Sequence, residues 1–278
     1  MTYKMVCIDM DGTLLGKGKK ISEENKKAIK RVHEKGIEVV VATGRIYNNA
    51  EYYSHILGVN SPVIAANGAI VRDKINNKVI YENPINNDEC LKLIDLLFEM
   101  KMFFHFYTID AIYSNSLVTD LATKIYMKKQ KGYEELKIKY HIIKDKKTWK
   151  DIFKKNNNEI NKCIAMTPNP KKMIEFKEKL KEIKGIVYFG SGSRSVEINN
   201  GGVSKGNAVK ALAEYYGIKR EEIVAIGDNE NDLSMIEYAG IGVAMGNAID
   251  SVKNVADYIT SSNKDNGVAK ALEKFFVV

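Results

Sequence analysis

The sequence predicts a doubly wound α/β fold, in which helices cover both faces of a mostly parallel sheet. Short apolar runs alternate with amphipathic segments in the first and last parts of the chain. Several of these runs end in polar, glycine-containing turns. Alternating strands and helices favour a parallel sheet, and open sheets of this kind bind ligands beyond the carboxyl ends of their strands.

The first part of the chain alternates between strands and helices. The runs at 3–8 and 37–42 are apolar and rich in β-branched residues, which is typical of buried strands. Between them, Ser22 is placed to cap a helix that ends near Gly36. The expected elements are strands 3–8, 37–42 and 62–66, helices 22–36 and 46–57, and a hairpin near 69–72 and 79–81.

A different pattern begins near residue 85. Leu91, Ile94, Leu97 and Phe98 form a helical stripe, and the segment 103–114 is aromatic and β-like. Further expected elements are helix 118–130, strand 162–167, helix 171–183 and strand 186–189. Two rounds of helix and strand predict a small α+β domain at 85–190, inserted into a core formed by 1–84 and 191–278.

The first pattern resumes after this insertion. The expected elements are strand 196–198, helix 205–216, strand 223–226, helix 232–238, strand 240–244 and helix 267–275. The strand at 223–226 ends in the polar turn Gly227-Asp228-Asn229-Glu230-Asn231-Asp232. This part therefore extends the same α/β core.

Composition limits the classes of protein. The chain has 278 residues, of which 45% are hydrophobic and 28% charged, as in globular proteins of one large or two modest domains. Its three cysteines form no CxxC pair, which argues against a disulfide framework or a zinc site. No segment approaches the roughly 20 apolar residues of a membrane span, and no signal peptide precedes the first strand. We therefore expect a cytoplasmic location and no membrane partner.

The net charge of +8 has two interpretations. Segment 85–190 carries 21 Lys against 14 Asp and Glu, so most of the excess lies there. Nucleic-acid binding is one interpretation, but no arginine cluster or glycine-aromatic motif supports it. A solvated lysine-rich surface fits better. Attraction of small anionic molecules is a weaker functional interpretation of the same charge. We expect a small phosphorylated metabolite as partner and no nucleic acid, while the sequence indicates no particular oligomeric state.

Four acidic residues follow two predicted strands. Asp9 and Asp11 come after the first strand, and Asp228 and Asp232 come after the strand at 223–226. If these strands are neighbours, up to four carboxylates meet at one edge, where they would repel and raise each other's pKa. A hard cation removes that conflict. Mg²⁺ is the expected cofactor because it prefers oxygen ligands and is commonly held by carboxylates together with phosphate.

Donor groups follow other strands. Thr43 and Gly44 offer a hydroxyl and backbone N–H groups, and Lys205 opens a predicted helix. A lysine at a helix start suits a phosphate dianion. Carboxylates, a cation and N–H donors together favour phosphoryl transfer. We expect Asp9 to be the nucleophile, giving an aspartyl-phosphate intermediate, and Asp11 to be the general acid and base.

These residues carry a family resemblance. The motifs Asp9-Met10-Asp11-Gly12-Thr13, Thr43-Gly44-Arg45, Lys205 and Gly227 to Asp232 resemble, in order, the four motifs of the haloacid dehalogenase superfamily. Asn67-Gly68-Ala69, the segment 202–206 and the long insertion resemble its Cof-type sugar-phosphatase branch. An Asp at position 11 is typical of the phosphatases of the superfamily and not of its dehalogenases.

The resemblance implies roles for individual residues. It implies Mg²⁺ bound by Asp9, the backbone carbonyl of Asp11 and Asp228, with Asp232 supporting the site. The phosphate-binding residues that it implies are Thr43, Gly44, Lys205, Asn231 and the amide of Met10. It also implies that the insertion is a cap domain that closes over the substrate.

Some alternatives stay open at this point. Asp232 could cap the helix that follows it, Arg45 could form a structural salt bridge or order the site, and Asn67 could order the site or only make a turn. The expected function is Mg²⁺-dependent hydrolysis of small phosphomonoesters, sugar phosphates above all. A phosphomutase and a non-catalytic phosphate-binding regulatory protein are the alternatives.

Overall fold

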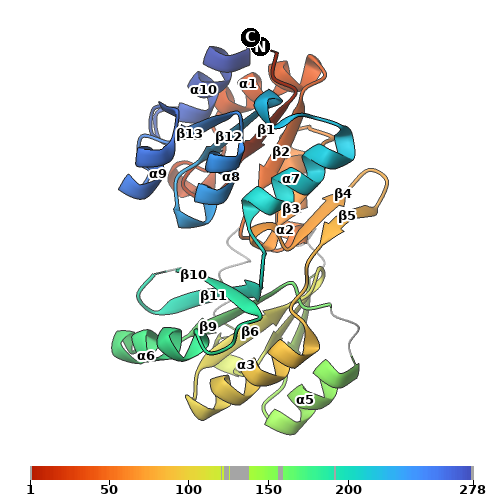
Figure 1. Cartoon of the computed structure of the whole chain (residues 1–278), viewed down its shortest axis with the longest axis vertical. Helices are drawn as coiled ribbons and strands as arrows, with labels where there is room; N and C mark the ends of the chain where they lie inside the picture. The colour runs from red at the N-terminus through yellow and green to blue at the C-terminus, as the bar shows by residue number, and fades with distance from the viewer. Residues whose placement is uncertain are drawn as a thin grey trace. The chain divides into compact units, whose positions relative to one another are not determined.

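The protein is seen in a computed structural model that describes residues 2–119, 121, 125, 138–155, 159–190 and 192–276. The chain forms two compact units (Figure 1). One consists of Met1–Glu82 and Ser204–Val278, and the other of Asn83–Val203. Each unit has its own hydrophobic core.

The first unit is built on an eight-stranded sheet in the order β14-β13-β12-β1-β2-β3-β4-β5. All neighbours from β14 to β3 pair in parallel, and β4 and β5 add an antiparallel hairpin. The strands are β1 (Met5–Ile8), β2 (Glu38–Ala42), β3 (Val63–Ala65), β4 (Ile70–Asp73), β5 (Lys78–Glu82), β12 (Ile223–Gly227), β13 (Ile241–Ala244) and β14 (Tyr258–Ile259). The predicted doubly wound, mostly parallel core is confirmed.

Strand β1 lies at the centre of this sheet. Met5 is in register with Glu38 of β2 on one side and with Ile223 of β12 on the other. Every residue of β1 and β12 is buried, which agrees with their continuous apolar sequences. The carboxyl ends of β1, β2 and β12 therefore meet at one edge of the sheet.

Helices of the first unit pack against each other in pairs around this sheet. Helix α1 packs on α10, and α7 packs on α8. The Ser22 hydroxyl accepts from the Asn25 N–H at 3.2 Å, so the predicted cap begins α1. The helices are α1 (Glu23–Glu34), α2 (Tyr47–Ile56), α7 (Lys205–Tyr216), α8 (Leu233–Tyr238), α9 (Asp250–Val255) and α10 (Gly267–Phe276). Among them, α9 was not predicted.

The second unit has a six-stranded sheet in the order β10-β11-β9-β6-β7-β8. Helices α3, α5 and α6 lie on one face of it (Figure 1). The elements are α3 (Asn87–Glu99), β6 (Phe103–Tyr107), β7 (Ala111–Ser114), β8 (Lys139–Ile142), α5 (Lys146–Lys155), β9 (Lys162–Met166), α6 (Pro170–Leu180), β10 (Ile186–Gly190) and β11 (Ser195–Asn200). The aromatic run 103–114 is thus two strands, and the predicted helix 118–130 lies largely outside the described residues.

Two parts of the second unit differ from the sequence prediction. Strand β8 and helix α5 were not predicted, and α5 buries Trp149 and Phe153. Strand β11 was assigned to the core, but it pairs antiparallel with β9 and β10. The unit therefore ends at Val203 instead of residue 190. The alternating residues of β11 suit a half-buried strand of either sheet, so only its pairing partners decide where it belongs.

Within the part of the chain that the structure describes, no helix is both long and apolar enough to cross a membrane.

Candidate active site

Three of the four predicted acidic residues gather at the edge where β1 and β12 end. One carboxylate oxygen from each of Asp9, Asp228 and Asp232 lies within 4.8 Å of the others. Asp9 and Asp232 are buried, and Asp228 is partly buried. The fourth carboxylate, that of Asp11, is instead held by Arg45. The adjacency of β1 and β12 therefore brings together residues that are far apart in the sequence.

Lys205 is the cation of this cluster. Its ammonium group donates to Asp9 Oδ1 at 2.6 Å and to Asp232 Oδ1 at 2.5 Å. Lys205 is the first residue of α7. Ser204, just before it, caps the helix, because its hydroxyl oxygen accepts from the Asn207 N–H. The side chain is fully buried, so its charge is stabilised by the two carboxylates rather than by water.

Asp232 uses both of its carboxylate oxygens within the protein. Besides Lys205, it accepts from the backbone N–H groups of Asp228 at 2.9 Å and Asn229 at 3.0 Å. It makes no side-chain cap bond to α8, the helix that follows. The helix-cap alternative is therefore not observed. Asp232 orients the Asp228 loop and Lys205, which agrees with a supporting role beside the cluster.

Burial and charge shift the pKa values of the cluster. Burial, and next the Asp232 carboxylate, raise the pKa of Asp9 well above its ordinary value, with Lys205 acting against them. Burial raises the pKa of Asp228 to about 6, although a hydrogen bond from Thr13 opposes this shift. Burial alone would lower the pKa of Lys205, but Asp232 and Asp9 raise it. Lys205 alone therefore does not offset the burial of the Asp9 and Asp228 carboxylates, whereas the two carboxylates of Asp9 and Asp232 do offset the burial of the Lys205 ammonium group.

The charge balance of the cluster fits a divalent cation. If all three carboxylates are ionised, they face only one ammonium group, and an excess of negative charge is left in a largely buried site. Buried charge of one sign is costly unless it is paired or bound to a metal. The donors are all oxygens, and hard cations such as Mg²⁺ prefer oxygen. Asp9 and Asp228 are the candidate ligands, because both oxygens of Asp232 already accept hydrogen bonds.

The loop after β1 is built around Gly12. Its φ of +90° is a left-handed conformation, and a Cβ at this position would lie 2.3 Å from Asp228 Oδ2. The next residue, Thr13, donates from its hydroxyl to Asp228 Oδ1 at 2.8 Å. Asn247, beyond β13, donates to the Gly12 carbonyl at 2.9 Å. The close approach of the Gly12 backbone to Asp228 therefore requires glycine.

The predicted phosphate-binding residues belong to this unit and follow several strands. Thr43 comes directly after β2 and is buried, and its hydroxyl oxygen accepts from the Arg45 N–H at 3.2 Å. Gly44 follows it and is partly buried. Asn231 donates to Asn67 Oδ1 at 3.0 Å. Met10 is buried at the end of β1. These positions are compatible with the predicted roles, and we return to them in the proposed function.

Asn67 holds one of these loops in place. It has a φ of +61° and is fully buried. Its N–H donates to the Thr43 carbonyl at 3.0 Å, and its side chain accepts from Asn231. It therefore makes the turn after β3 and also links the loops that follow β2 and β12, which is compatible with a site-ordering role.

Arg45 makes a salt bridge with Asp11. Its Nε donates to Asp11 Oδ2 at 2.6 Å and its Nη2 to Asp11 Oδ1 at 2.7 Å. Burial would raise the pKa of Asp11, but the hydrogen bonds and the charge of Arg45 outweigh it and lower this pKa below its ordinary value. The salt bridge and the site-ordering role are again compatible, because the partner of Arg45 is a predicted catalytic residue.

Sequence reasoning missed some contacts of the site. It assigned no role to Asn247 or to Asn49, which accepts from Arg45 Nη1 at 2.6 Å. Asn247 closely follows β13 and so belongs to the same carboxyl edge as the motifs, a position that could have indicated it. Asn49 lies in the first turn of α2, four residues after Arg45, which precedes the helix.

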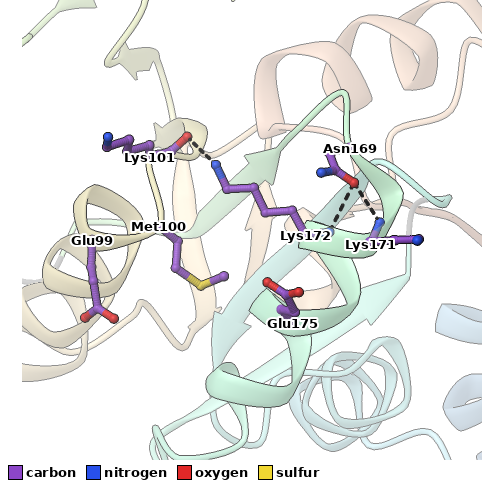
Figure 2. A pocket seen from close by; sticks show the side chains of 7 residues that line it. All are labelled: Glu99, Met100, Lys101, Asn169, Lys171, Lys172 and Glu175. Atoms are coloured by element: carbon purple, nitrogen blue, oxygen red, sulfur yellow. Dashed lines mark hydrogen bonds between the residues drawn. The ribbon is translucent and has the colours of Figure 1, made fainter.

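A separate hollow of about 460 Å³ lies in the second unit, where α3 ends and α6 begins (Figure 2). Lys172 Nζ donates to the Lys101 carbonyl at 3.1 Å, and Asn169 caps α6 by accepting from the Lys171 and Lys172 N–H groups. The other residues that line the hollow are Glu99, Met100 and Glu175. It contains none of the residues predicted for the active site.

Comparison with known proteins identifies the family. The model of the family described as haloacid dehalogenase-like hydrolase matches residues 6–272. A Bacillus subtilis protein named 5-amino-6-(5-phospho-D-ribitylamino)uracil phosphatase YwtE is 33% identical over 98% of this chain and 97% of its own length.

Solved structures agree with this match. A haloacid dehalogenase-like hydrolase from Bacteroides thetaiotaomicron is 30% identical, with a TM-score of 0.83, and covers 99% of this chain and 100% of its own. The subclass IIB sugar phosphatase BT4131 is 25% identical, with a TM-score of 0.79 and coverage of 99% and 100%. The protein is thus a phosphomonoester hydrolase with an α/β fold. The chain belongs to the haloacid dehalogenase-like hydrolases, in their Cof-type branch.

Proposed function

We propose that this protein hydrolyses small phosphomonoesters, sugar phosphates above all, with Mg²⁺ and through an aspartyl-phosphate intermediate. The observation that carries the proposal is the buried cluster of Asp9, Asp228, Asp232 and Lys205 at the edge where β1 and β12 end. The named activities of the relatives support the substrate class, because YwtE acts on a phosphorylated ribityl compound and BT4131 on sugar phosphates.

Mg²⁺ would be held by Asp9, Asp228 and the backbone carbonyl of Asp11. When bound, the cation supplies positive charge that neutralises the phosphoryl oxygens. Asp232 has the supporting role, since it holds the Asp228 backbone and Lys205. Thr13 fixes the other side of Asp228 through its hydroxyl. These contacts preorganise the ligands before substrate arrives.

The phosphate group would be bound by donors from several loops. We assign this role to Thr43, Gly44, Lys205, Asn231 and the Met10 amide. The Thr43 hydroxyl oxygen accepts from Arg45, so its own proton can be donated to phosphate. Asn67 orders the Asn231 side chain for the same purpose.

The reaction would proceed in two steps. In the first, a carboxylate oxygen of Asp9 forms a bond to phosphorus, the ester P–O bond breaks, and Asp11 in its protonated form gives the proton to the leaving oxygen. Because Arg45 lowers the pKa of Asp11, this protonated form is the minor one in the free protein. In the second, water attacks the same phosphorus and gives a proton to Asp11. The bond between phosphorus and Asp9 breaks, so phosphate is released and the Asp9 carboxylate is restored. Lys205 holds Asp9 through a hydrogen bond to Oδ1. In this proposal, the second unit, Asn83–Val203, is the cap domain that gives access to the site.

The test is phosphate release from a panel of sugar phosphates and other phosphorylated metabolites, with Mg²⁺ and with EDTA. We expect release with Mg²⁺ and none with EDTA. Movement of phosphate to a second hydroxyl without release would instead indicate a phosphomutase. Binding of phosphate esters without any turnover would indicate a non-catalytic phosphate-binding protein.

A further inference from the structure

Arg45 makes a bidentate salt bridge with Asp11, the predicted general acid. Its Nε and Nη2 donate to the two different oxygens of Asp11, at 2.6 and 2.7 Å. Such bidentate pairing fixes the plane of the carboxylate as well as its distance, which a single lysine contact does not do. The orientation of the Asp11 carboxylate is therefore set by Arg45.

The guanidinium group is itself held by helix α2. Its third nitrogen, Nη1, donates to Asn49 Oδ1 at 2.6 Å, and its Cζ lies 5.1 Å from the centre of the Tyr53 ring. Arg45, Asn49 and Tyr53 are four residues apart, so α2 presents both partners in one row. The side chain of Arg45 is 11% exposed, whereas that of Asp11 is 49% exposed. Arg45 is thus the fixed partner and Asp11 the accessible one.

This geometry matters because proton transfer is sensitive to position. A general acid must come within about 2.6–3.2 Å of the oxygen that it protonates, and a misplacement of about 1 Å can cost roughly a hundredfold in rate. We propose that Arg45 is a positioning residue, which holds the Asp11 carboxyl group in the orientation from which it exchanges a proton with the leaving-group oxygen. The inference depends on the proposed function, in which Asp11 is the general acid and base.

The choice of substrate separates this role from a purely structural one. An alkyl phosphate has a strongly basic leaving oxygen, which needs a proton as the P–O bond breaks. The leaving oxygen of p-nitrophenyl phosphate carries its charge without that proton. Loss of Asp11 positioning should therefore slow the first step, the release of the leaving group, for the alkyl substrate alone. The second step, in which Asp11 accepts a proton from water, is the same for both substrates. A general disturbance of the site would slow both substrates to the same extent.

The experiment compares the rate of the first step, measured as release of the leaving group in a single turnover, for a sugar phosphate and for p-nitrophenyl phosphate at saturating Mg²⁺. The variants are Arg45→Met, Arg45→Lys, Asp11→Asn and the double variant of Asp11→Asn with Arg45→Met. Arg31→Gln is the matched control, because Arg31 forms an exposed salt bridge with Glu273 in the same unit. We expect Arg45→Met to lower this first-step rate for the sugar phosphate by about a hundredfold and for p-nitrophenyl phosphate by less than about threefold.

Further readouts complete the comparison. Asp11→Asn should show the same selective loss, and the double variant should lose no more than Asp11→Asn alone, since the two residues act as one unit. Arg45→Lys keeps the positive charge but cannot make the bidentate contact, so its rate should lie between those of Arg45→Met and the unmodified protein. Asn49→Ala leaves Arg45 present but less firmly held, so it should give a smaller loss with the same preference. This variant keeps the inference testable if Arg45→Met does not fold.

The outcomes distinguish failure of the positioning role of Arg45 from failure of the proposed phosphatase function. Equal losses for both substrates in Arg45→Met and Asn49→Ala, or losses that add fully to those of Asp11→Asn, would overturn the positioning role. A faster sugar-phosphate reaction in Arg45→Met would also overturn it, since the salt bridge would then restrain Asp11 from reacting. Failure of the unmodified protein to release phosphate from either substrate would instead refute the proposed function.

Discussion

The hydroxyl of Thr13 donates to Asp228 Oδ1 at 2.8 Å, although 215 positions separate the two residues in the chain. The contact joins the loop after β1 to the loop after β12, the two strands that lie side by side at the centre of the first sheet. It means that the acidic cluster forms only when both ends of the sequence have folded together. The predictions below test this cluster and its surroundings.

Asp9→Asn should abolish turnover. The amide has nearly the same shape as the carboxylate but cannot attack phosphorus, so we expect phosphate release to fall by about a thousandfold or more. The measurement is phosphate release at saturating Mg²⁺, with denaturant unfolding to show that the variant is folded. Asp250→Asn, at an exposed position of α9, is the control. Activity of Asp9→Asn close to that of the control would exclude Asp9 as the nucleophile.

Lys205→Met should destabilise the protein as well as inactivate it. The substitution leaves the buried carboxylates of Asp9 and Asp232 without their cation, which typically costs about 3–5 kcal/mol. Lys210→Met, at an exposed position of the same helix, should change the free energy of unfolding by less than about 0.5 kcal/mol. Urea unfolding of both variants measures the difference. Equal stability of the two would show that the ion pairs do not hold the loops together.

Gly12→Ala should disrupt the cluster more than the same change at Gly18. Both glycines have positive φ, +90° and +71°, so both substitutions carry the cost of a left-handed conformation, about 1–2 kcal/mol. Only at Gly12 would the added Cβ meet Asp228, whereas nothing lies within 4 Å at Gly18. We expect loss of Mg²⁺-dependent activity in Gly12→Ala alone. Similar activity in both variants would argue against the close approach.

Mg²⁺ should raise the thermal stability of the protein. A cation that binds only the folded state stabilises it by about 2.7 kcal/mol at a hundred times its Kd. The relief of repulsion among Asp9, Asp228 and Asp232 gives the physical reason. The measurement is Tm across an Mg²⁺ series at constant ionic strength. The shift should disappear in Asp228→Asn and persist in Asp250→Asn, and a shift that is unchanged in Asp228→Asn would place the cation elsewhere.

Lys74 should make the stability depend on pH. Its ammonium group donates to Ser54 Oγ at 2.5 Å and to the Val59 carbonyl, and burial lowers its pKa from 10.5 to about 8. Between pH 8 and 10.5 the unfolded chain therefore binds more protons than the folded one, so this residue makes stability rise with pH in that window. Below pH 8 the cost of burying the charge is fully present.

The check on Lys74 is urea unfolding of the unmodified protein and of Lys74→Met at pH 7 and pH 10. The unmodified protein should gain stability relative to this variant as the pH rises. The same comparison with Lys210→Met should give no pH-dependent difference. If the unmodified protein gained no stability relative to Lys74→Met between pH 7 and pH 10, the pKa of Lys74 would lie at its ordinary value in the folded protein.

Much of this architecture could be predicted because the core follows local rules. The runs that became β1, β2 and β12 are apolar throughout, and Ser22 caps α1 as expected. Where prediction failed, the answer depended on partners distant in sequence. The residues of β11 fit either sheet, and α5 is a short lysine-rich helix whose buried face consists of Trp149 and Phe153.

The candidate site shows the same limit. The motifs placed Asp9, Asp228 and Lys205 at one edge, and the structure brings them together. The sequence could not show that Asp11 faces Arg45 instead of the other carboxylates, because that depends on a side-chain orientation set by helix α2. Nor could it show that both oxygens of Asp232 are taken by backbone groups and Lys205.

The pairing of β1 with β12 also governs the order in which the chain can fold during its synthesis. Met5 must wait for Ile223 before the centre of the first sheet is complete, whereas the segment Asn83–Val203 has all of its own sheet by the time β11 is made. Contacts between distant segments form slowly, and domains fold as units while synthesis proceeds. The inserted unit should therefore fold first during synthesis, while β1 still lacks its neighbour β12.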